Sequence, residues 1–136
     1  MPYRIVPCVT GELYHVFNRS IAMEVILQDD RDYDRLYNLV AYYRYPKPIH
    51  CYSDYHRLSF MAQSEVLQRM TQNEPIVDIC GFSFMPTHFH FLLRQNIDNG
   101  ISIFISQVQN GYAKYINRKR KRSGSAFQSM YKARLV

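Results

Sequence analysis

The sequence predicts an α+β fold, a ferredoxin-like β-α-β-β-α-β antiparallel sheet with its helices on one face. Three observations predict this fold: a strand-like run near the start, two β-prone runs in the middle separated by a short break, and long amphipathic helical patterns on either side of that pair. The chain has 136 residues, of which 47% are hydrophobic. We therefore expect one packed domain over residues 1–136.

The first half of the pattern begins with a strand over residues 11–20, where two sets of side chains alternate along the chain. A helix follows from Asp29 or Asp30 to about Tyr43, because an Asp can cap it and its apolar residues recur at helical spacing. The two prolines after Tyr45 end that helix, since proline cannot donate a backbone hydrogen bond.

The middle of the chain contains an insertion and a hairpin. The insertion covers residues 46–72 and is predicted to consist of a loop over 46–58 and a short helix over 59–72. Two apolar, β-prone runs over 76–84 and 88–94 then form the hairpin, because the Met-Pro-Thr between them interrupts the strand pattern.

A long amphipathic helix is predicted to begin at Asp98, Asn99 or Gly100. Its apolar positions form one continuous stripe at helical spacing. The stripe consists of Ile101, Phe104, Ile105, Val108, Tyr112, Tyr115 and Ile116. After Gly124, which we expect to end the connection, residues 127–136 are predicted to form the last strand.

Charge is unevenly distributed along the chain. The formal net charge is +6, and no Asp or Glu follows Asp98. Eight of the 17 basic residues lie in this last part of the sequence, without acidic residues between them. Such a one-sign segment favours a polyanionic partner, of which nucleic acid is the commonest, whereas the alternative is a solvated helix end with a soluble tail.

The sequence also predicts the compartment. No apolar run reaches the roughly 18 residues that a membrane span needs, and the first residues lack the apolar core of a signal peptide. The three cysteines are odd in number and widely spaced. These features predict reduced thiols, a cytoplasmic location and no membrane partner.

Two histidines, His88 and His90, stand one residue apart in the second run of the hairpin. Because side chains alternate faces along a strand, both imidazoles point the same way, about 6.5–7 Å apart along the chain. If the opposite face carries the helices, the two histidines lie on the open face of the sheet. Together they could bind one metal ion, with further ligands from elsewhere, or one phosphate. The pair alone is also typical of two surface histidines.

Four motifs, in order along the chain, resemble those of the single-tyrosine HUH transposases. They are YHVFNRS (14–20), MPTHFHFLL (85–93), YAKYIN (112–117) and GSAFQSMYK (124–132). The nearest branch by this pattern is the REP-associated tyrosine transposases with their insertion-sequence relatives. The motifs cover most of the chain and fall on the predicted elements, although the insertion is longer than the family usually has there.

The resemblance implies a metal-dependent endonuclease and strand transferase that acts on single-stranded or hairpin DNA. In such an enzyme, His88 and His90 bind a divalent cation, Mg²⁺ or Mn²⁺, which polarises the scissile phosphate. A tyrosine attacks the phosphorus and leaves a 5′-phosphotyrosine and a free 3′-OH, which conserves the bond energy for rejoining. Mg²⁺ prefers oxygen ligands, so imidazole ligation favours Mn²⁺.

The nucleophile is the point at which the sequence departs from the family. There it lies in a Tyr-Ile-x-x-Asn-Pro motif after the last strand, and its Asn supplies a third metal ligand. This sequence has no such motif, so we expect the domain to lack that helix and the nucleophile to lie beyond Val136. Tyr112 and Tyr115 are the candidates within the chain, but one helical turn after each comes Ile116 or Lys119, neither of which is a neutral oxygen ligand. Both tyrosines also belong to the apolar stripe, which predicts packing in the core.

The predicted DNA contacts are nine basic residues and one tyrosine. Lys and Arg beside phosphates gain affinity by counterion release, and aromatic rings stack on unpaired bases. The predicted set is Arg19, Lys114, Arg118, Lys119, Arg120, Lys121, Arg122, Tyr131, Lys132 and Arg134. His15, by contrast, alternates with apolar residues of the first strand and is predicted to be buried.

Two other functions stay open. One is a ferredoxin-like nucleic-acid-binding domain without catalysis, in which the basic residues bind and the histidines are incidental. The other is a structural or partner-binding protein descended from a transposase. The resemblance also leaves a homodimer open, because insertion-sequence relatives act as dimers and REP-associated ones as monomers.

Overall fold

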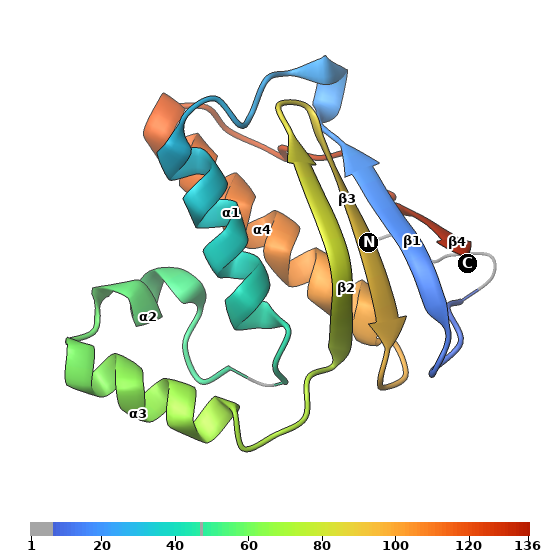
Figure 1. Cartoon of the computed structure of the whole chain (residues 1–136). Coiled ribbons are helices and arrows are strands. Elements are labelled where there is room, and N and C mark those ends of the chain that lie inside the picture. Colours follow the sequence, from blue (N-terminus) through green and yellow to red (C-terminus); the bar gives the residue numbers. More distant parts are fainter. Residues whose placement is uncertain (1–6, 47) are drawn as a thin grey trace.

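Four antiparallel strands form one sheet in the order β2-β3-β1-β4 in the computed structural model, which describes residues 7–46 and 48–136 (Figure 1). The strands are β1 (Leu13–Arg19), β2 (Val77–Met85), β3 (His88–Gln95) and β4 (Lys132–Leu135). In this order β1 and β3 lie in the centre of the sheet, and β2 and β4 form its edges. The predicted ferredoxin-like fold is confirmed.

Helices cover one face of this sheet and leave the other open (Figure 1). The long helix α4 (Gly100–Arg120) packs against the sheet, and α1 (Asp30–Tyr43) packs beside it. Gly111 allows their close approach, because a Cβ there would meet Leu39 Cδ2 of α1 at 2.8 Å. In the described ranges we find no helix that combines the length and apolarity that a membrane span requires.

The core lies between the sheet and these two helices. In β1 and β3, every second side chain is buried under the helices, among them Tyr14, Val16, Phe89, Phe91 and Leu93. The apolar stripe of α4 meets them as predicted, with six of its seven members fully buried and Tyr115 half-buried. Because strand residues alternate faces, the remaining side chains of β1 and β3 lie on the open face.

Several boundaries follow from local chemistry. Asp29 caps α1, since its carboxylate accepts a hydrogen bond from Asp32 N, and Ser59 caps α3 (Phe60–Met70) in the same way through Ala62 N. The turn at residues 86–87 joins β2 to β3 as the Met-Pro-Thr sequence predicted. The η1 turn (Ile21–Met23) follows β1 directly.

The insertion contains a helix where we predicted a loop. Residues 52–57 form α2 (Tyr52–Arg57), because Tyr52 and Tyr55 are buried against Tyr42 of α1, with ring centroids 5.5 and 4.8 Å from it. Hydrogen bonds hold the insertion further: the Tyr42 hydroxyl donates to His50 O at 2.6 Å, and Tyr52 N donates to the Tyr43 hydroxyl at 2.9 Å. A six-residue helix that depends on tertiary contacts leaves too short a pattern to predict.

The last strand is shorter than predicted. Lys132–Leu135 form the strand that pairs with β1, whereas residues 127–131 run along α4, from Phe127 beside Tyr112 to Tyr131 beside Ser102. Phe127 and Tyr131 are buried there, and Phe127 makes a single bridge to Ser20. Because this segment packs into the core, it reaches the sheet edge only at Lys132.

Candidate functional site

The open face of the sheet gathers the two predicted histidines at its centre. In the β1–β3 pairing, His88 lies opposite Arg19 and His90 lies opposite Phe17. Directly opposed residues of antiparallel strands share a face, so these four side chains lie side by side on the side away from the helices. The rings of His88 and His90 have centroids 5.2 Å apart and stand nearly perpendicular, at 84°.

A third histidine joins them. His15 is half-buried on the open face rather than buried in the core as we predicted, and its ring stacks on that of His90 at 5.1 Å. His15 Nε2 and His90 Nδ1 are 2.9 Å apart, so one of the two rings donates a hydrogen bond to the other. The sequence held the signal for this, because the alternation of the first strand places His15 on the same face as Phe17.

The ring nitrogens of the pair differ in their partners. The Nδ1 atoms of His88 and His90 are taken, the first by Thr87 Oγ1 at 3.1 Å and the second by His15. No described residue hydrogen-bonds to either Nε2. Burial, and then the neighbouring imidazoles of His15 and His88, lower the pKa of His90. A lowered pKa keeps this imidazole neutral and able to bind a cation at neutral pH.

A hollow of about 230 Å³ opens beside these rings. It is bordered by His88 and His90 from β3, by Phe17 and Arg19 from β1, and by Met23 from the η1 turn. The Phe17 ring stacks between His15, at 4.7 Å, and His90, at 5.6 Å. The hollow thus combines an aromatic floor, two imidazoles and a guanidinium group.

Two basic residues of β4 complete the open face. Lys132 lies opposite Phe17, and Arg134 lies opposite His15 with its guanidinium carbon 5.5 Å from the centroid of the Phe17 ring. Within residues 7–46 and 48–136, no carboxylate lies in ion-pair range of Arg19, Lys132 or Arg134. Their charge is therefore available to an anionic partner.

Two imidazoles on one face fit a divalent cation as a partial donor set. Imidazole is a common ligand of Mn²⁺ and other transition metals, and the two Nε2 atoms have no other partner in the described part of the chain. That part holds no group of three or more His, Cys, Asp or Glu side chains that could bind a metal. The remaining ligands would be water, phosphate oxygens or groups from outside the described residues.

The structure does not bring Tyr112 or Tyr115 to the histidines. Both lie on α4, on the opposite side of the sheet. Tyr112 is fully buried and its hydroxyl donates to Ile26 O, while the Tyr115 hydroxyl donates to Asp32 Oδ1 at 2.8 Å. Burial raises the pKa of both phenols, and for Tyr115 the hydrogen bond to Asp32 raises it further. Both act as packing residues here.

Tyr131 is likewise placed in the core and not on the surface. Its side chain is 2% exposed and its hydroxyl pairs with Ser102 Oγ at 2.7 Å. It therefore cannot stack on a base in this arrangement, contrary to the prediction. Phe17 is the aromatic residue that the open face offers instead.

Three of the predicted DNA contacts are tied to carboxylates. Lys119 pairs with Asp29 at 2.8 Å and with Asp32 at 2.7 Å, and Arg120 pairs with Asp32 at 3.2 Å. Arg122 pairs with Glu24 at 3.1 Å. We predicted this basic run to be unopposed, but residues 24–32 supply its counter-charges. Three further members of the predicted set, Lys114, Arg118 and Lys121, are exposed.

Asp32 is the centre of that ion-pair network. Its side chain is fully buried, and burial alone would raise the pKa of its carboxyl. The hydrogen bonds from Lys119, from Gln28 N and from the Tyr115 hydroxyl outweigh burial and lower the pKa to about 2. The carboxylate is thus charged at all ordinary pH values, and it fixes the end of α4 against the start of α1.

Comparison with solved structures shows that this fold is one found among transposases. One similar structure is a REP-associated tyrosine transposase bound to a REP hairpin, with a TM-score of 0.60 at 10% identity over 100% of this chain and 62% of that one. Another is a putative transposase from Deinococcus radiodurans R1, with a TM-score of 0.54 at 14% identity over 99% of this chain and 86% of that one. The chain thus spans less than two thirds of the REP-associated transposase.

These likenesses confirm, at the level of the fold, the resemblance to tyrosine transposases that the motifs predicted. No protein-family model and no curated protein matches the chain.

Proposed function

We propose that this chain is a transposase-type nuclease domain that binds single-stranded or hairpin DNA on the open face of its sheet and cleaves it with the help of a divalent metal ion. One observation carries the proposal: His88 and His90 lie side by side over a hollow that is flanked by unpaired basic residues. The transposase fold and the REP hairpin in one similar structure support DNA as the ligand.

In this proposal His88 and His90 hold the metal ion through their Nε2 atoms, because both Nδ1 atoms have hydrogen-bond partners. A bound Mn²⁺ or Mg²⁺ would supply Lewis-acid stabilisation of charge on the scissile phosphate. Imidazole ligands favour Mn²⁺ over Mg²⁺. His15 orients His90. When His90 Nδ1 carries the ring proton and donates a hydrogen bond to His15 Nε2, the lone pair of His90 Nε2 faces outward.

The basic residues and Phe17 position the strand. Arg19, on β1 beside His88, and Lys132 and Arg134, on β4, would contact phosphates along the side of the sheet from the histidines to its β4 edge. Phe17 presents its ring between them, where an unpaired base could stack. This assignment replaces Tyr131 with Phe17 as the stacking residue.

The nucleophile in this proposal is a tyrosine that is not part of α4, because Tyr112 and Tyr115 lie beneath the sheet. Its phenolic hydroxyl loses its proton as the oxygen forms a bond to phosphorus, and the bond from phosphorus to the 3′ oxygen breaks. The 3′ oxygen leaves and takes up a proton, so that a 5′-phosphotyrosine and a 3′-hydroxyl result. Rejoining reverses these steps with another 3′-hydroxyl.

Metal binding tests the proposal most directly. We expect the protein to bind Mn²⁺, measured by electron paramagnetic resonance or calorimetry, and both His88→Ala and His90→Ala to abolish that binding. His56→Ala is the matched control, since His56 is an exposed histidine on α2 away from the open face. Mn²⁺ affinity that is unchanged in both open-face variants, or absent from the wild type, contradicts the metal site.

A second function, binding of single-stranded nucleic acid without cleavage, is favoured by a separate observation. The described residues hold no group of three or more His, Cys, Asp or Glu that could bind a metal, and no tyrosine is among those that line the hollow. Incubation of the protein with end-labelled hairpin DNA and Mn²⁺ separates the two functions. A covalent protein–DNA adduct supports the nuclease, and strand binding that survives His88→Ala without any adduct supports the binding module.

A further inference from the structure

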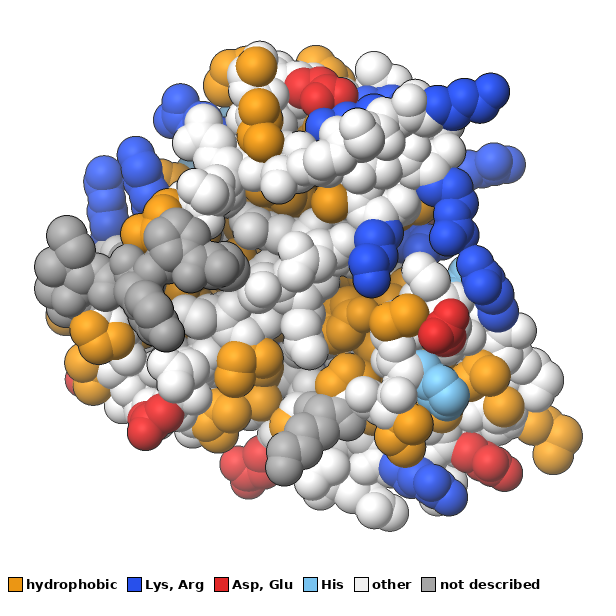
Figure 2. Space-filling model, turned by 180° about the vertical axis from the view of Figure 1, so that it is seen from behind, with side chains coloured by type: hydrophobic (Ala, Val, Ile, Leu, Met, Phe, Trp, Pro, Cys, Tyr) orange, Lys and Arg blue, Asp and Glu red, His pale blue; other side chains and the backbone are white. Residues whose placement is uncertain are grey.

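The insertion forms a groove with α4 on the side of the molecule away from the histidines. Three hollows of about 300, 640 and 620 Å³ open along the outer side of α4, and Lys114 borders all three. Because the inner side of α4 packs on the sheet, this groove and the open face lie on opposite sides of the helical layer. In the view from behind, Lys and Arg side chains gather on the side of the helices (Figure 2).

One part of the groove is basic. Five described cations border the hollow of about 620 Å³, of which Lys119 is paired with Asp29 and Asp32. The other four are Arg35 of α1, Arg57 of α2, and Lys114 and Arg118 of α4. Among the described residues that line it, Asp54 is the single carboxylate. The four cations come from three different helices, and none of them has a carboxylate in ion-pair range within the described ranges. Three helices thus direct a net positive charge at a shared space, which favours a phosphate-bearing ligand.

Arg35 is held in place by aromatic rings. Its guanidinium carbon lies 4.8 Å from the centroid of the Tyr115 ring and 5.2 Å from that of Tyr52. Tyr52 is fixed in turn by its backbone hydrogen bond to the Tyr43 hydroxyl. Arg35 is therefore held in place before any ligand binds, which lowers the entropic cost of its contact with a ligand.

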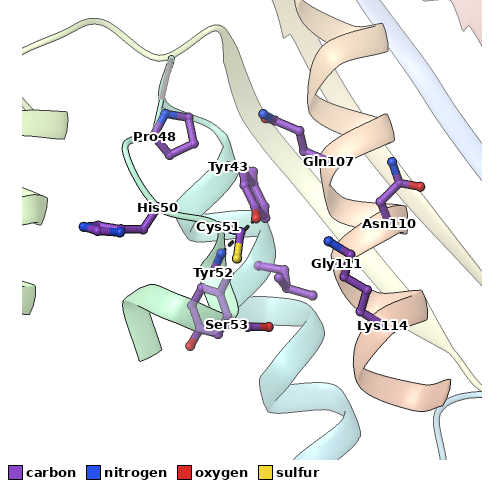
Figure 3. Close-up of a pocket in the computed structure, with 11 residues that line it drawn as sticks. Tyr43, Pro48, His50, Cys51, Tyr52, Ser53, Gln107, Asn110, Gly111 and Lys114 are labelled. Carbon is purple, nitrogen blue, oxygen red and sulfur yellow. Dashed lines mark hydrogen bonds between the residues drawn. The ribbon is translucent and has the colours of Figure 1, made fainter. Parts of the chain in front are cut away.

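The neighbouring part of the groove is mainly polar, and Lys114 is the one Lys or Arg among its described lining residues. In the hollow of about 300 Å³, Gln107 extends from α4 toward Tyr43 of α1 and Cys51 of the insertion, and Asn110 of α4 also borders the hollow (Figure 3). The amide oxygen Oε1 of Gln107 is buried, and no described residue donates a hydrogen bond to it. The amide nitrogen Nε2 of Gln107 faces the hollow instead (Figure 3), so a ligand that brings a hydrogen-bond acceptor would gain a partner there.

We infer that this groove is a second binding site for single-stranded nucleic acid, which we call the insertion groove. Arg35, Arg57, Lys114 and Arg118 contact the phosphates, and one base enters the amide-lined hollow, where its carbonyl oxygen accepts a hydrogen bond from Gln107 Nε2. Lys114 joins the two parts, because it borders both hollows. The choice of DNA over other polyanionic strands rests on the proposed function. The geometry of the groove is independent of the proposed function. The inference gives the insertion a role that the sequence alone did not assign.

Photocrosslinking locates the site. We expect a single-stranded oligonucleotide with 4-thiothymidine at several positions to crosslink to peptides that contain residues 48–57 or 107–118. Crosslinks from the open face, to β1, β3 or β4, are expected in addition if the proposed function holds. Crosslinks that come from the open face alone overturn the insertion groove.

Salt dependence tests the phosphate contacts. We expect Arg57→Gln and Lys114→Gln each to weaken binding of the oligonucleotide and to make the slope of log K against log[salt] shallower by about 0.7, the value for one phosphate contact on a single strand. Arg69→Gln is the matched control, because Arg69 is an exposed cation of the same insertion, on α3, outside the groove. Equal slopes for all three variants and the wild type overturn the inference.

The base pocket has its own measurement. An oligonucleotide in which abasic sites replace the bases is expected to bind the wild type more weakly than the intact strand, and Gln107→Leu is expected to narrow that difference. A difference that is unchanged by Gln107→Leu contradicts the base pocket. His88→Ala separates this site from the open face: it removes Mn²⁺ binding if the proposed function is right, but leaves the crosslinks to residues 48–57 and 107–118 in place.

Discussion

The basic end of α4 and the open face of the sheet carry the same kinds of side chain and use them differently. At the end of α4, Lys119 and Arg120 pair with the buried Asp32, and Arg122 pairs with Glu24. On the open face, Lys132 and Arg134 have no carboxylate in ion-pair range within the described ranges. The densest run of charge in the sequence is therefore in part structural, and the sparser set is available for a ligand.

This contrast shows that the density of charge along a sequence does not predict where a polyanion binds. Buried and paired charges hold elements together, and their loss is expected to change stability. Exposed and unpaired charges raise the local potential, and their loss is expected to change affinity and its salt dependence. Variants in the two regions should thus separate cleanly by what they alter.

The largest expected effect is that of Asp32→Asn on stability. The substitution leaves Lys119 and Arg120 without their buried counter-charge, and it weakens the hydrogen bond from the Tyr115 hydroxyl. We expect the free energy of unfolding to fall by about 3 kcal/mol, measured by urea denaturation. Asp30→Asn, at an exposed position in the first turn of the same helix, is the control and should cost well under half as much.

The stability of the protein at low pH should depend on the Asp32 carboxylate as well. The pKa of Asp32 is lowered from 3.8 to about 2 in the folded state, so its contribution is complete above pH 4 and is lost as the pH falls toward 2. This shift corresponds to about 2 kcal/mol. We expect the wild type to lose that much more stability than Asp32→Asn between pH 4.5 and pH 2. Parallel pH profiles for the two proteins would show that Asp32 does not act as an ion-pair centre.

On the open face, the expected effect of His15→Phe is on metal affinity rather than on stability. Phenylalanine keeps the stacked ring but removes the hydrogen bond to His90 Nδ1. Partners of this kind typically change metal affinity by about 10-fold or more, so we expect Mn²⁺ to bind about 10-fold more weakly. The tautomer of His90, followed by ¹⁵N NMR without metal, should change as well. An unchanged tautomer in the variant means that His15 does not orient His90.

Local patterns predicted the elements of this fold, and what they missed depends on tertiary contacts. The capped helix α1, the hairpin of β2 and β3 and the apolar stripe of α4 all follow from spacing and capping residues. The helix α2 does not, because its stability comes from rings that it packs against α1. Element types are encoded locally, whereas short elements held by packing are not.

The same distinction holds for the candidate site. The pair His88 and His90 could be predicted from strand alternation alone, since both belong to one strand. His15 belongs to another strand, so its contact with His90 depends on the register between β1 and β3. The position of Tyr131 in the core and the partners of Lys119 likewise depend on how distant segments pack. Side chains on separate elements meet only in the folded chain.

The smallest expected effects are those of single basic residues on DNA binding. They compare the paired cations of α4 with the unpaired cations of the open face most directly. We expect Lys132→Gln and Arg134→Gln each to make the salt slope of single-strand binding shallower by about 0.7, with little change in stability. Arg120→Gln should lower the free energy of unfolding and leave the salt slope unchanged, because its guanidinium group donates hydrogen bonds to Asp32 and to Val25 O. Anisotropy titrations at several salt concentrations and urea denaturation of the same three variants measure both quantities. A shallower slope in Arg120→Gln at unchanged stability would mean that the paired cations bind DNA as well, and would remove the distinction between the two regions.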